Sequence, residues 1–276
     1  MRPPDPAQSF KAFEHEGWER VASPYRTAFS SLTIQSVSPL LDAAGVATGV
    51  RLLDVACGPG DASAAAAVRG AQVTGLDFAS AMVEQASRFN PDVAFRTGDA
   101  EALPFEDASF DAVVINFGIL HFADPDRAIA EASRVLRSGG RFAFTVWAPP
   151  EKCEGFAIVL RSVEAHGRMD VPLPAGPPFF RFADHGECRR VLGAAGFANA
   201  SVCELPMRWQ LPAADALIEA FLDGGVRTRG LLMAQTPEAL GAIRAAARVE
   251  AARCACQGGV EFSMPAVLAS GVKVRR

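Results

Sequence analysis

The sequence predicts an α/β fold, namely a doubly wound, Rossmann-like sheet of mostly parallel strands with a helical lid. Between Arg51 and Trp147, short apolar runs alternate with helix-compatible runs, as in repeated βαβ units. The apolar runs are nearly continuous in Val, Leu, Ile and Phe, which suits strands covered by helices on both faces. A glycine-rich turn follows the first run, at the position where doubly wound folds bind ligands.

Five strands and three helices are expected in this central segment. The strands are expected at residues 51–56, 72–77, 93–99, 110–118 and 141–148, and the helices at 61–70, 80–89 and 125–140. The last helix has clear ends, because Asp124 can cap it, Pro125 suits its first turn, and Gly139 and Gly140 follow Arg134 and Arg137.

The chain divides into three parts on this interpretation. Residues 1–50 are an N-terminal helical arm or lid, with helical positions over 14–41 broken at Pro24 and Pro39. Residues 51–148 are the cofactor-binding core. Residues 149–276 complete the sheet and add helical lid insertions at about 149–184 and 206–264.

The last part contains recognisable turn and helix signals. A Pro/Gly-rich loop is expected at 172–178, and a helix at 185–196 that Gly196 ends. A strand is expected at 201–209 and a final strand at 265–274. Between them, residues 212–256 read as helices with a break at Gly224 and Gly225 and a new start at Thr236.

Composition narrows the class of protein. Half of the 276 residues are apolar and 21% are charged, with a formal net charge of −4, which disfavours a nucleic-acid partner because phosphate binding needs a concentrated basic surface. The six cysteines are scattered, and Cys254 and Cys256 lack a second ligand cluster, so reduced thiols and no metal site are expected. No stretch approaches a membrane span, and the N-terminus lacks the apolar run of an export signal, so a cytoplasmic protein is expected.

The glycine-rich turn points to an adenosine cofactor. Asp54 ends the first strand, Gly58 and Gly60 lie in the turn, and a glycine lets the backbone approach a ligand closely. Asp77 ends the second strand, nineteen positions after Gly58, where a carboxylate accepts hydrogen bonds from ribose hydroxyls.

The same turn disfavours a nicotinamide cofactor. The third glycine of G-x-G-x-x-G is replaced by Ser63, and Asp61 would place a negative charge beside a pyrophosphate. S-adenosylmethionine suits an acidic loop better, because it has no phosphate, a cationic sulfonium and an α-amino group that donates to carboxylates.

Four segments, LLDVACGPGD, GLDFASAMVEQA, GDAEALPFEDASFDAVV and RVLRSGGRFAFTVW, together resemble the class I S-adenosylmethionine-dependent methyltransferases, particularly the branch similar to the ubiquinone/menaquinone C-methyltransferases and methyltransferase type 11. The resemblance covers about half of the chain. It implies a seven-stranded sheet with an antiparallel last strand and a methyltransferase that acts on a small molecule.

The resemblance also implies which residues hold the cofactor. Gly58 and Gly60 would flank the methionine part, Asp77 would bind the ribose, and Asp99 with the Ala100 backbone would read the adenine. Asn116 to Gly118 would close the site. The other expected contacts on these motifs and the arm are Tyr25, Asp54, Ala56, Phe78, Met82, Glu101, Asn116 and Phe117.

Several of these residues have alternative interpretations. Ala56 stands where the family often has glycine, which is tolerated if its φ is negative. Asp99 can be a turn residue and Asp54 a loop brace. Tyr25, the only tyrosine, either closes over the methionine carboxylate or is a half-buried helix residue.

Methyl transfer is an in-line displacement that depends mainly on alignment in a water-poor pocket. If the acceptor is a hydroxyl or an acidic carbon, His121 is the best-placed general base, and a structural hydrogen bond is its alternative role. Candidate walls of the acceptor pocket, which are also candidate lid core, are Trp18, Phe29, Trp147, Phe179, Phe180, Phe182, Arg227 and Arg229.

The predicted function is therefore methylation of a small, hydrophobic or aromatic molecule at oxygen, nitrogen or carbon. A non-enzymatic S-adenosylmethionine binder or partner subunit, and an NAD-dependent oxidoreductase, are the alternatives. The sequence does not identify the acceptor, and it leaves the oligomeric state open, a homodimer included.

Overall fold

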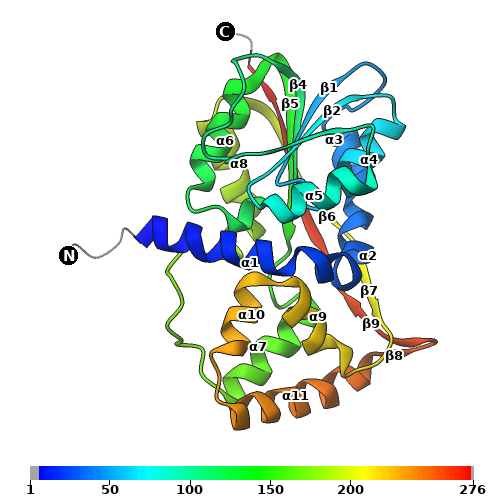
Figure 1. The fold of residues 1–276 in the computed structure, drawn as a ribbon, viewed down its shortest axis with the longest axis vertical. Coiled ribbons are helices and arrows are strands. Elements are labelled where there is room, and N and C mark those ends of the chain that lie inside the picture. The colour runs from blue at the N-terminus through cyan, green and yellow to red at the C-terminus, as the bar shows by residue number, and fades with distance from the viewer. Residues whose placement is uncertain (1–5, 275–276) are drawn as a thin grey trace.

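A seven-stranded sheet forms the core of the computed structural model, which describes residues 6–274. Its strand order is β3-β2-β1-β4-β5-β10-β6, and β10 runs antiparallel to both of its neighbours (Figure 1). The strands are β1 (Arg51–Val55), β2 (Gln72–Asp77), β3 (Ala94–Thr97), β4 (Phe110–Asn116), β5 (Leu136–Trp147), β6 (Phe197–Leu205) and β10 (Ala266–Lys273). The predicted fold class and the antiparallel last strand are confirmed. Residues 1–5 of the expected arm, and part of the N-terminal segment considered for export, lie outside the described residues.

The strand order reverses at β1, which pairs in parallel with β2 on one side and β4 on the other. The connection after β1 leads to β2 on one side and the connection after β4 leads to β5 on the other, so a crevice opens at the carboxyl ends of β1 and β4. Asp54 pairs with Gly75 in the register of β1 and β2, which places the ends of both strands at the same edge.

Both faces of the sheet are buried, because successive side chains of a strand point to opposite faces. Leu52 packs with helices α3 (Val37–Ala43) and α4 (Asp61–Val68), whereas Leu53 packs with α6 (Pro125–Val135) and α8 (His185–Ala194). Helix α5 (Ser80–Phe89) lies beside β2 and β3. The alternation accounts for the nearly continuous apolar strands.

The arm helix α1 (Pro6–Ala28) crosses between the sheet and the lid helices (Figure 1). The predicted breaks at Pro24 and Pro39 are wrong. Pro24 lies inside α1, where burial of Val21 and Ala28 on either side outweighs the lost hydrogen bond. After α2 (Ser30–Thr33) and a short 3-10 turn (Ile34–Ser36), Pro39 falls in the first turn of α3, where an N–H has no helical partner.

The lid consists of α7 (Glu154–His166), α9 (Ala216–Gly224), α10 (Val226–Met233) and α11 (Pro237–Ala251). A second sheet of three strands, in the order β7-β9-β8, adjoins it, and the sequence did not indicate this sheet. Its strands are β7 (Arg208–Leu211), β8 (Ala255–Cys256) and β9 (Gly259–Ser263). The single strand expected at 201–209 is in fact β6 and β7, because the chain leaves the large sheet at Pro206, which cannot donate to a ladder. Residues 255–256, expected in a helix, form β8.

Two boundaries of α6 test the sequence prediction directly. The Asp124 side chain accepts a hydrogen bond from the Arg127 backbone at 3.0 Å, as predicted for the cap. The carboxyl end was predicted too late, because the helix stops at Val135 and β5 already begins at Leu136. Gly139 therefore lies in the strand, with a φ of 76°.

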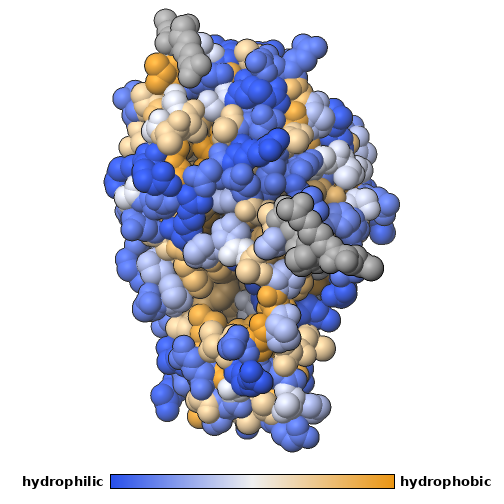
Figure 2. Space-filling model, turned by 90° about the vertical axis from the view of Figure 1, so that its left-hand side faces the viewer, coloured by the Kyte–Doolittle hydropathy of each residue, from blue (hydrophilic) through white to orange (hydrophobic). Residues whose placement is uncertain are grey.

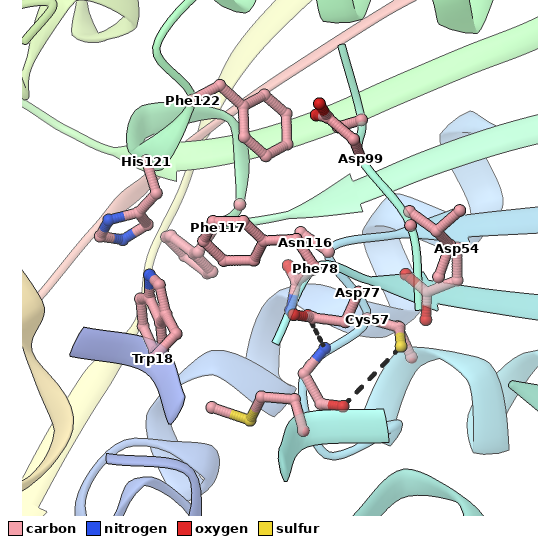
Figure 3. Close-up of a pocket in the computed structure, with 18 of the residues that line it drawn as sticks. Trp18, Asp54, Cys57, Asp77, Phe78, Asp99, Asn116, Phe117, His121 and Phe122 are labelled. Atoms are coloured by element: carbon pink, nitrogen blue, oxygen red, sulfur yellow. Dashed lines mark hydrogen bonds between the residues drawn. The ribbon is translucent and has the colours of Figure 1, made fainter. Parts of the chain in front are cut away.

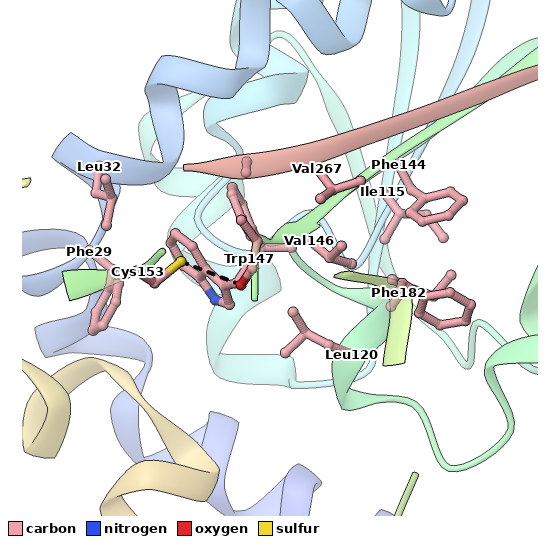
Figure 4. Packing of buried hydrophobic residues seen from close by; sticks show 14 of the residues in the cluster. Phe29, Leu32, Ile115, Leu120, Phe144, Val146, Trp147, Cys153, Phe182 and Val267 are labelled. Carbon is pink, nitrogen blue, oxygen red and sulfur yellow. Dashed lines mark hydrogen bonds between the residues drawn. The ribbon is translucent and has the colours of Figure 1, made fainter. Parts of the chain in front are cut away.

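The arm, the sheet and the lid share one apolar core. Trp147 at the end of β5 lies close to Phe29 of the arm, with ring centroids 6.4 Å apart (Figure 4). Its ring centroid is also 5.6 Å from that of Phe156 in α7. The arm is thus fixed by packing to both parts. Among residues 6–274, no helix is long and apolar enough to cross a membrane.

Candidate functional site

A cavity of about 920 Å³ lies at the carboxyl ends of β1, β2 and β4, beneath α1. Residues expected to contact the cofactor that line it are Tyr25, Asp54, Ala56, Gly58, Asp77, Phe78, Met82, Asp99, Ala100, Glu101, Asn116 and Phe117 (Figure 3). The structure thus brings together residues that are far apart in the sequence. We call this space the carboxylate cavity, because Asp54, Asp61, Asp77, Asp99 and Glu101 all line it.

The two glycines of the turn have different surroundings. A Cβ added to Gly58, whose φ is 53°, would meet nothing within 4 Å, so its backbone faces open space in the cavity. A Cβ added to Gly60 would lie 2.8 Å from Asn90 and 3.1 Å from Phe95. Gly60 is not among the residues that line the cavity, and its contact with a ligand stays a prediction. Its left-handed φ of 89° and close packing against α5 and β3 explain the glycine.

Asp77 both lines the cavity and braces the turn. Its carboxylate accepts hydrogen bonds from the backbone of Gly58 at 2.9 Å and of Ala79 at 3.0 Å. Burial raises the pKa of Asp77 to about 6, although these hydrogen bonds oppose the rise. The motif spacing of Gly58 and Asp77 therefore corresponds to a direct contact.

Asp54 is fully buried beside the same turn. One carboxylate oxygen accepts a hydrogen bond from the Ser63 hydroxyl at 2.6 Å, and Oδ1 has no partner among the described residues. Burial raises the pKa of Asp54 to about 7, and the nearby Asp77 charge adds to the rise. The hydrogen bond to Ser63 agrees with the role of Asp54 as a loop brace, and the unpartnered Oδ1 leaves an acceptor for a cofactor contact.

Two of the four described non-glycine residues with a left-handed φ line this cavity. Ala56 has a φ of 54° and Phe117 a φ of 55°, in the left-handed region that non-glycine residues rarely adopt. The condition under which alanine was expected to be tolerated at 56 is not met. The backbone is possible because Gly118 stands opposite, where an added Cβ would lie only 2.5 Å from the Ala56 Cβ.

Asp99 and Glu101 are tied to the arm by a lysine that sequence reasoning overlooked. The ammonium of Lys11 lies 2.5 Å from Asp99 Oδ2 and 2.9 Å from Glu101 Oε2, and Lys11 lines the cavity. These two carboxylates raise the pKa of Lys11, although burial alone would lower it. The scarcity of lysine in the sequence was the only available signal.

Asn116 is held rigidly at the end of β4. Its Oδ1 accepts hydrogen bonds from Ser36 at 2.7 Å and Thr145 at 2.6 Å, and its Nδ2 donates to the Thr33 carbonyl at 3.2 Å. The side chain thereby joins the arm to two strands of the sheet.

A second cavity, of about 420 Å³, adjoins the first on the lid side. Trp18, Tyr25, Phe117 and His121 line both spaces. The remaining wall is mainly aromatic, from Phe29, Trp147, Phe156, Phe179 and Phe221. We call this space the aromatic cavity. The outer face on which α1 begins is also hollowed, and apolar residues gather in that hollow (Figure 2).

His121 stands on the wall shared by the two cavities, edge-on to Trp18 with ring centroids 4.8 Å apart (Figure 3). Its Nδ1 lies 2.9 Å from Glu14 Oε2, and Arg227 Nε donates to Glu14 Oε1 at 2.8 Å. The Glu14 side chain is fully buried. An ionised carboxylate only accepts, so Nδ1 carries the proton in this contact, and in the neutral form of the ring Nε2 holds the lone pair.

Sequence reasoning missed Glu14, because a glutamate in an amphipathic arm helix resembles an ordinary solvent-facing residue.

Tyr25 has features of both of its interpretations. It lines both cavities, it packs on Phe29 within the arm, and burial raises its pKa to about 12.

The candidate acceptor walls divide into two groups. Those that line the aromatic cavity are Trp18, Phe29, Trp147, Phe179 and Arg227. Phe180 and Phe182 pack into the core instead, and Arg229 donates a hydrogen bond to the Leu222 carbonyl. None of these last three lines the aromatic cavity, and their contact with an acceptor stays a prediction.

In the part of the chain that the structure describes, no group of three or more His, Cys, Asp or Glu side chains could hold a metal ion. Cys254 is half-buried and Cys256 is exposed in the short strand β8, and both are free thiols.

Comparison with known proteins bears on the central segment. A family model described as a methyltransferase domain matches residues 53–144. The chain carries a methyltransferase domain. This match contains the turn, the Asp77 strand end and the Asp99 loop, and it confirms the resemblance to class I methyltransferases for this part of the chain.

A demethylmenaquinone methyltransferase from Beutenbergia cavernae is 45% identical over 123 residues, which are 43% of this chain and 51% of that protein. The chain spans about half the length of the curated relatives it matches first.

Two solved structures resemble the fold. The YcgJ protein from Bacillus subtilis is 24% identical, with a TM-score of 0.58 over 87% of this chain and 99% of that one. Phosphoethanolamine N-methyltransferase 2 from Haemonchus contortus, in complex with phosphomonomethylethanolamine and S-adenosylhomocysteine, is 18% identical, with a TM-score of 0.59 over 97% and 61%. At these identities the likeness concerns the fold alone.

Proposed function

We propose that this protein transfers a methyl group from S-adenosylmethionine to a small hydrophobic or aromatic acceptor. The observation that carries the proposal is the pair of adjoining cavities, one rich in carboxylates and one aromatic, with His121 on their shared wall. A cofactor in the first and an acceptor in the second would meet at that wall.

The carboxylate cavity fits this cofactor chemically. Five carboxylates and one lysine line it, which favours a cation and disfavours a pyrophosphate. The partnerless Oδ1 of Asp54 is a buried acceptor that a cofactor N–H or O–H would satisfy. The open space at Gly58 leaves room for close backbone approach. The phosphoethanolamine N-methyltransferase whose fold this chain resembles was solved with S-adenosylhomocysteine bound, which supports the assignment.

The proposed residue roles are those that the resemblance to class I methyltransferases implies, and the place of each residue on the cavity wall supports them. We expect Gly58 to border the methionine part, Asp77 to accept from the ribose hydroxyls, and Asp99 with the Ala100 backbone to contact the adenine. A ligand at Asp99 must share that carboxylate with Lys11, or displace the ammonium. Asn116 and Phe117 complete the wall beside the acceptor.

The bound cofactor supplies an electrophilic methyl group, and the chain supplies alignment and a dry setting. The aromatic wall holds a flat acceptor and excludes water. The free Nε2 of His121 accepts a proton from an acceptor hydroxyl or acidic carbon, while Glu14 fixes the ring through Nδ1. Glu14 is then a positioning residue.

Binding and transfer experiments test this function. Calorimetric titration should show binding of S-adenosylmethionine and S-adenosylhomocysteine, and NAD should not bind. Binding of NAD alone would refute the proposal in favour of an oxidoreductase. Incubation with methyl-labelled S-adenosylmethionine and metabolite extracts should label a small molecule. Cofactor binding without any labelled product would favour a binding protein or partner subunit.

A further inference from the structure

We propose that the aromatic cavity selects acceptors that carry an anionic oxygen group, such as a carboxylate on an aromatic ring, and that Arg227 binds this group. The inference rests on the proposed function, because it names the acceptor class of the same site. Arg227 and its partner Glu14 both lie outside residues 53–144, the segment that matches the family model.

The first argument is an unused donor. Arg227 Nε donates to Glu14 at 2.8 Å and Nη1 donates to the Pro177 carbonyl at 2.7 Å, whereas Nη2 is buried with no partner among the described residues. The guanidinium lies over the Phe10 and Phe179 rings, at 4.4 and 5.6 Å from their centroids, but these contacts give Nη2 no hydrogen-bond acceptor in place of water. Arg227 lines the aromatic cavity, so an acceptor oxygen placed there would satisfy Nη2.

The second argument is the contrast in charge between the two cavities. Five carboxylates line the carboxylate cavity, but no Asp or Glu is among the described residues that line the aromatic cavity. Its charged and titratable groups are Arg227, His121 and the Tyr25 hydroxyl, whose pKa is raised by burial to about 12, and the Glu14 carboxylate contacts Arg227 and His121. The first space thus suits a cation, and the second suits an anion.

The third argument is the charge balance during reaction. One carboxylate binds both His121 and Arg227, so the two lie close together on one side of the cavity. When a hydroxyl proton of the acceptor moves to His121 Nε2 and the hydroxyl oxygen takes the methyl group, His121 becomes a cation. Arg227 and protonated His121 are then balanced by Glu14 and the acceptor's anionic group. A neutral acceptor would leave this site with an excess positive charge.

Binding of small probes to the full chain, saturated with S-adenosylhomocysteine, tests the inference. The probes are salicylate, its neutral isostere salicylamide, and phenol, measured by calorimetry or by quenching of tryptophan fluorescence, since Trp18 and Trp147 line the cavity. One charge-assisted hydrogen bond is worth about 1.5–3 kcal/mol, so we expect salicylate to bind roughly 10- to 100-fold more tightly than salicylamide. Equal affinity for the two probes would overturn the inference.

Variants assign the preference to Arg227. Arg227→Lys keeps a positive charge beside Glu14 but loses the planar guanidinium with its paired N–H donors. It should reduce the preference for salicylate over salicylamide at least about tenfold. The double variant Glu14→Gln/Arg227→Gln leaves no unpaired buried carboxylate and should abolish the preference. Arg229→Lys is the matched control on the same helix, because Arg229 does not line the cavity, and it should keep the preference. Preference retained in both Arg227 variants, with thermal melts showing folded protein, would overturn the assignment.

The outcome separates this inference from the proposed function. Titration with S-adenosylhomocysteine alone reports the carboxylate cavity. If S-adenosylhomocysteine binds and salicylate shows no preference, only the acceptor class is refuted. If neither cofactor form binds, the proposed function fails, and the probe preference can still be measured on the free chain.

Discussion

At the scale of single residues, the turn after β1 depends on a matched pair of small side chains. Ala56 adopts a left-handed φ, and its Cβ occupies the space that a Cβ on Gly118 would need, at 2.5 Å. The φ of Gly118 is −84°, so alanine there is disfavoured only by the clash. The two positions are therefore coupled through one contact.

We expect Gly118→Ala to lower the free energy of unfolding by about 1–3 kcal/mol, as overpacking of a close contact does. Adding Ala56→Gly removes the clashing methyl group and should restore a large part of that loss. Urea unfolding of the four proteins in the double-mutant cycle measures the coupling. Strictly additive effects would show that the contact does not limit the turn.

The buried Glu14 fixes the tautomer of His121. Nitrogen-15 NMR of the imidazole should show the proton on Nδ1 and a lone pair on Nε2. In Glu14→Gln the side chain offers either an oxygen or an NH₂ group to Nδ1, so we expect a mixture of tautomers. His185, the first residue of α8, lines neither cavity, so its signal serves as a reference in the same spectrum. An unchanged His121 spectrum in the variant would contradict the positioning role.

At the scale of elements, helix α1 covers the carboxylate cavity and is fastened at its edge by Lys11. The side chains of Lys11, Asp99 and Glu101 are 34%, 38% and 13% exposed, so solvent screens the ion pairs appreciably. Such pairs contribute about 0–1 kcal/mol. These ion pairs, which we call the Lys11 latch, therefore adjust how readily α1 opens. Apolar packing provides most of the attachment of α1 to the rest of the protein.

We expect Lys11→Met to quicken release of S-adenosylhomocysteine by up to about fivefold, the rate change that corresponds to about 1 kcal/mol. Stopped-flow tryptophan fluorescence measures the release rate. Lys152→Met is the matched control, because Lys152 pairs with Glu204 on a different part of the chain. Release that is unchanged or slower in Lys11→Met would argue against a latch.

At the scale of the whole molecule, buried acids make folding and ligand binding depend on pH in opposite directions. The folded pKa of Asp54, about 7, exceeds its ordinary value of 3.8, so the folded state holds the proton more tightly than the unfolded state. The stability from Asp54 is fully present below about pH 4 and is lost as the pH rises through about 7. Asp77, at about 6, acts in the same direction.

A cationic ligand should reverse this dependence, because it favours the ionised carboxylates. S-adenosylhomocysteine is the comparison ligand, because its sulfur is uncharged. We expect the ratio of the affinity for S-adenosylmethionine to that for S-adenosylhomocysteine to rise by up to about tenfold between pH 6 and pH 8. The melting temperature of the free protein should fall over the same range. Asp54→Asn should flatten both trends, measured by calorimetry and thermal melts. A constant affinity ratio in the natural protein would show that these acids do not sense the sulfonium.

The sequence by itself determined the α/β core, the position of the binding turn and the pairing of Gly58 with Asp77. These features follow from local rules, because strand period, glycine conformation and the length of a βαβ unit constrain neighbouring residues along the chain. The cap at Asp124 followed from the same kind of local rule, whereas the antiparallel last strand was expected only from the resemblance to class I methyltransferases.

Only the tertiary structure decided how the arm completes the site. Glu14, Lys11 and Arg227 meet their partners across separations of 107, 88 and 213 residues, and no local pattern encodes such contacts. Pro24 remained helical, and Gly60 turned toward α5, because packing outweighed the local preference in each case. The aromatic cavity exists for the same reason, since side chains from the arm, the sheet and the lid leave that space only when all three have packed.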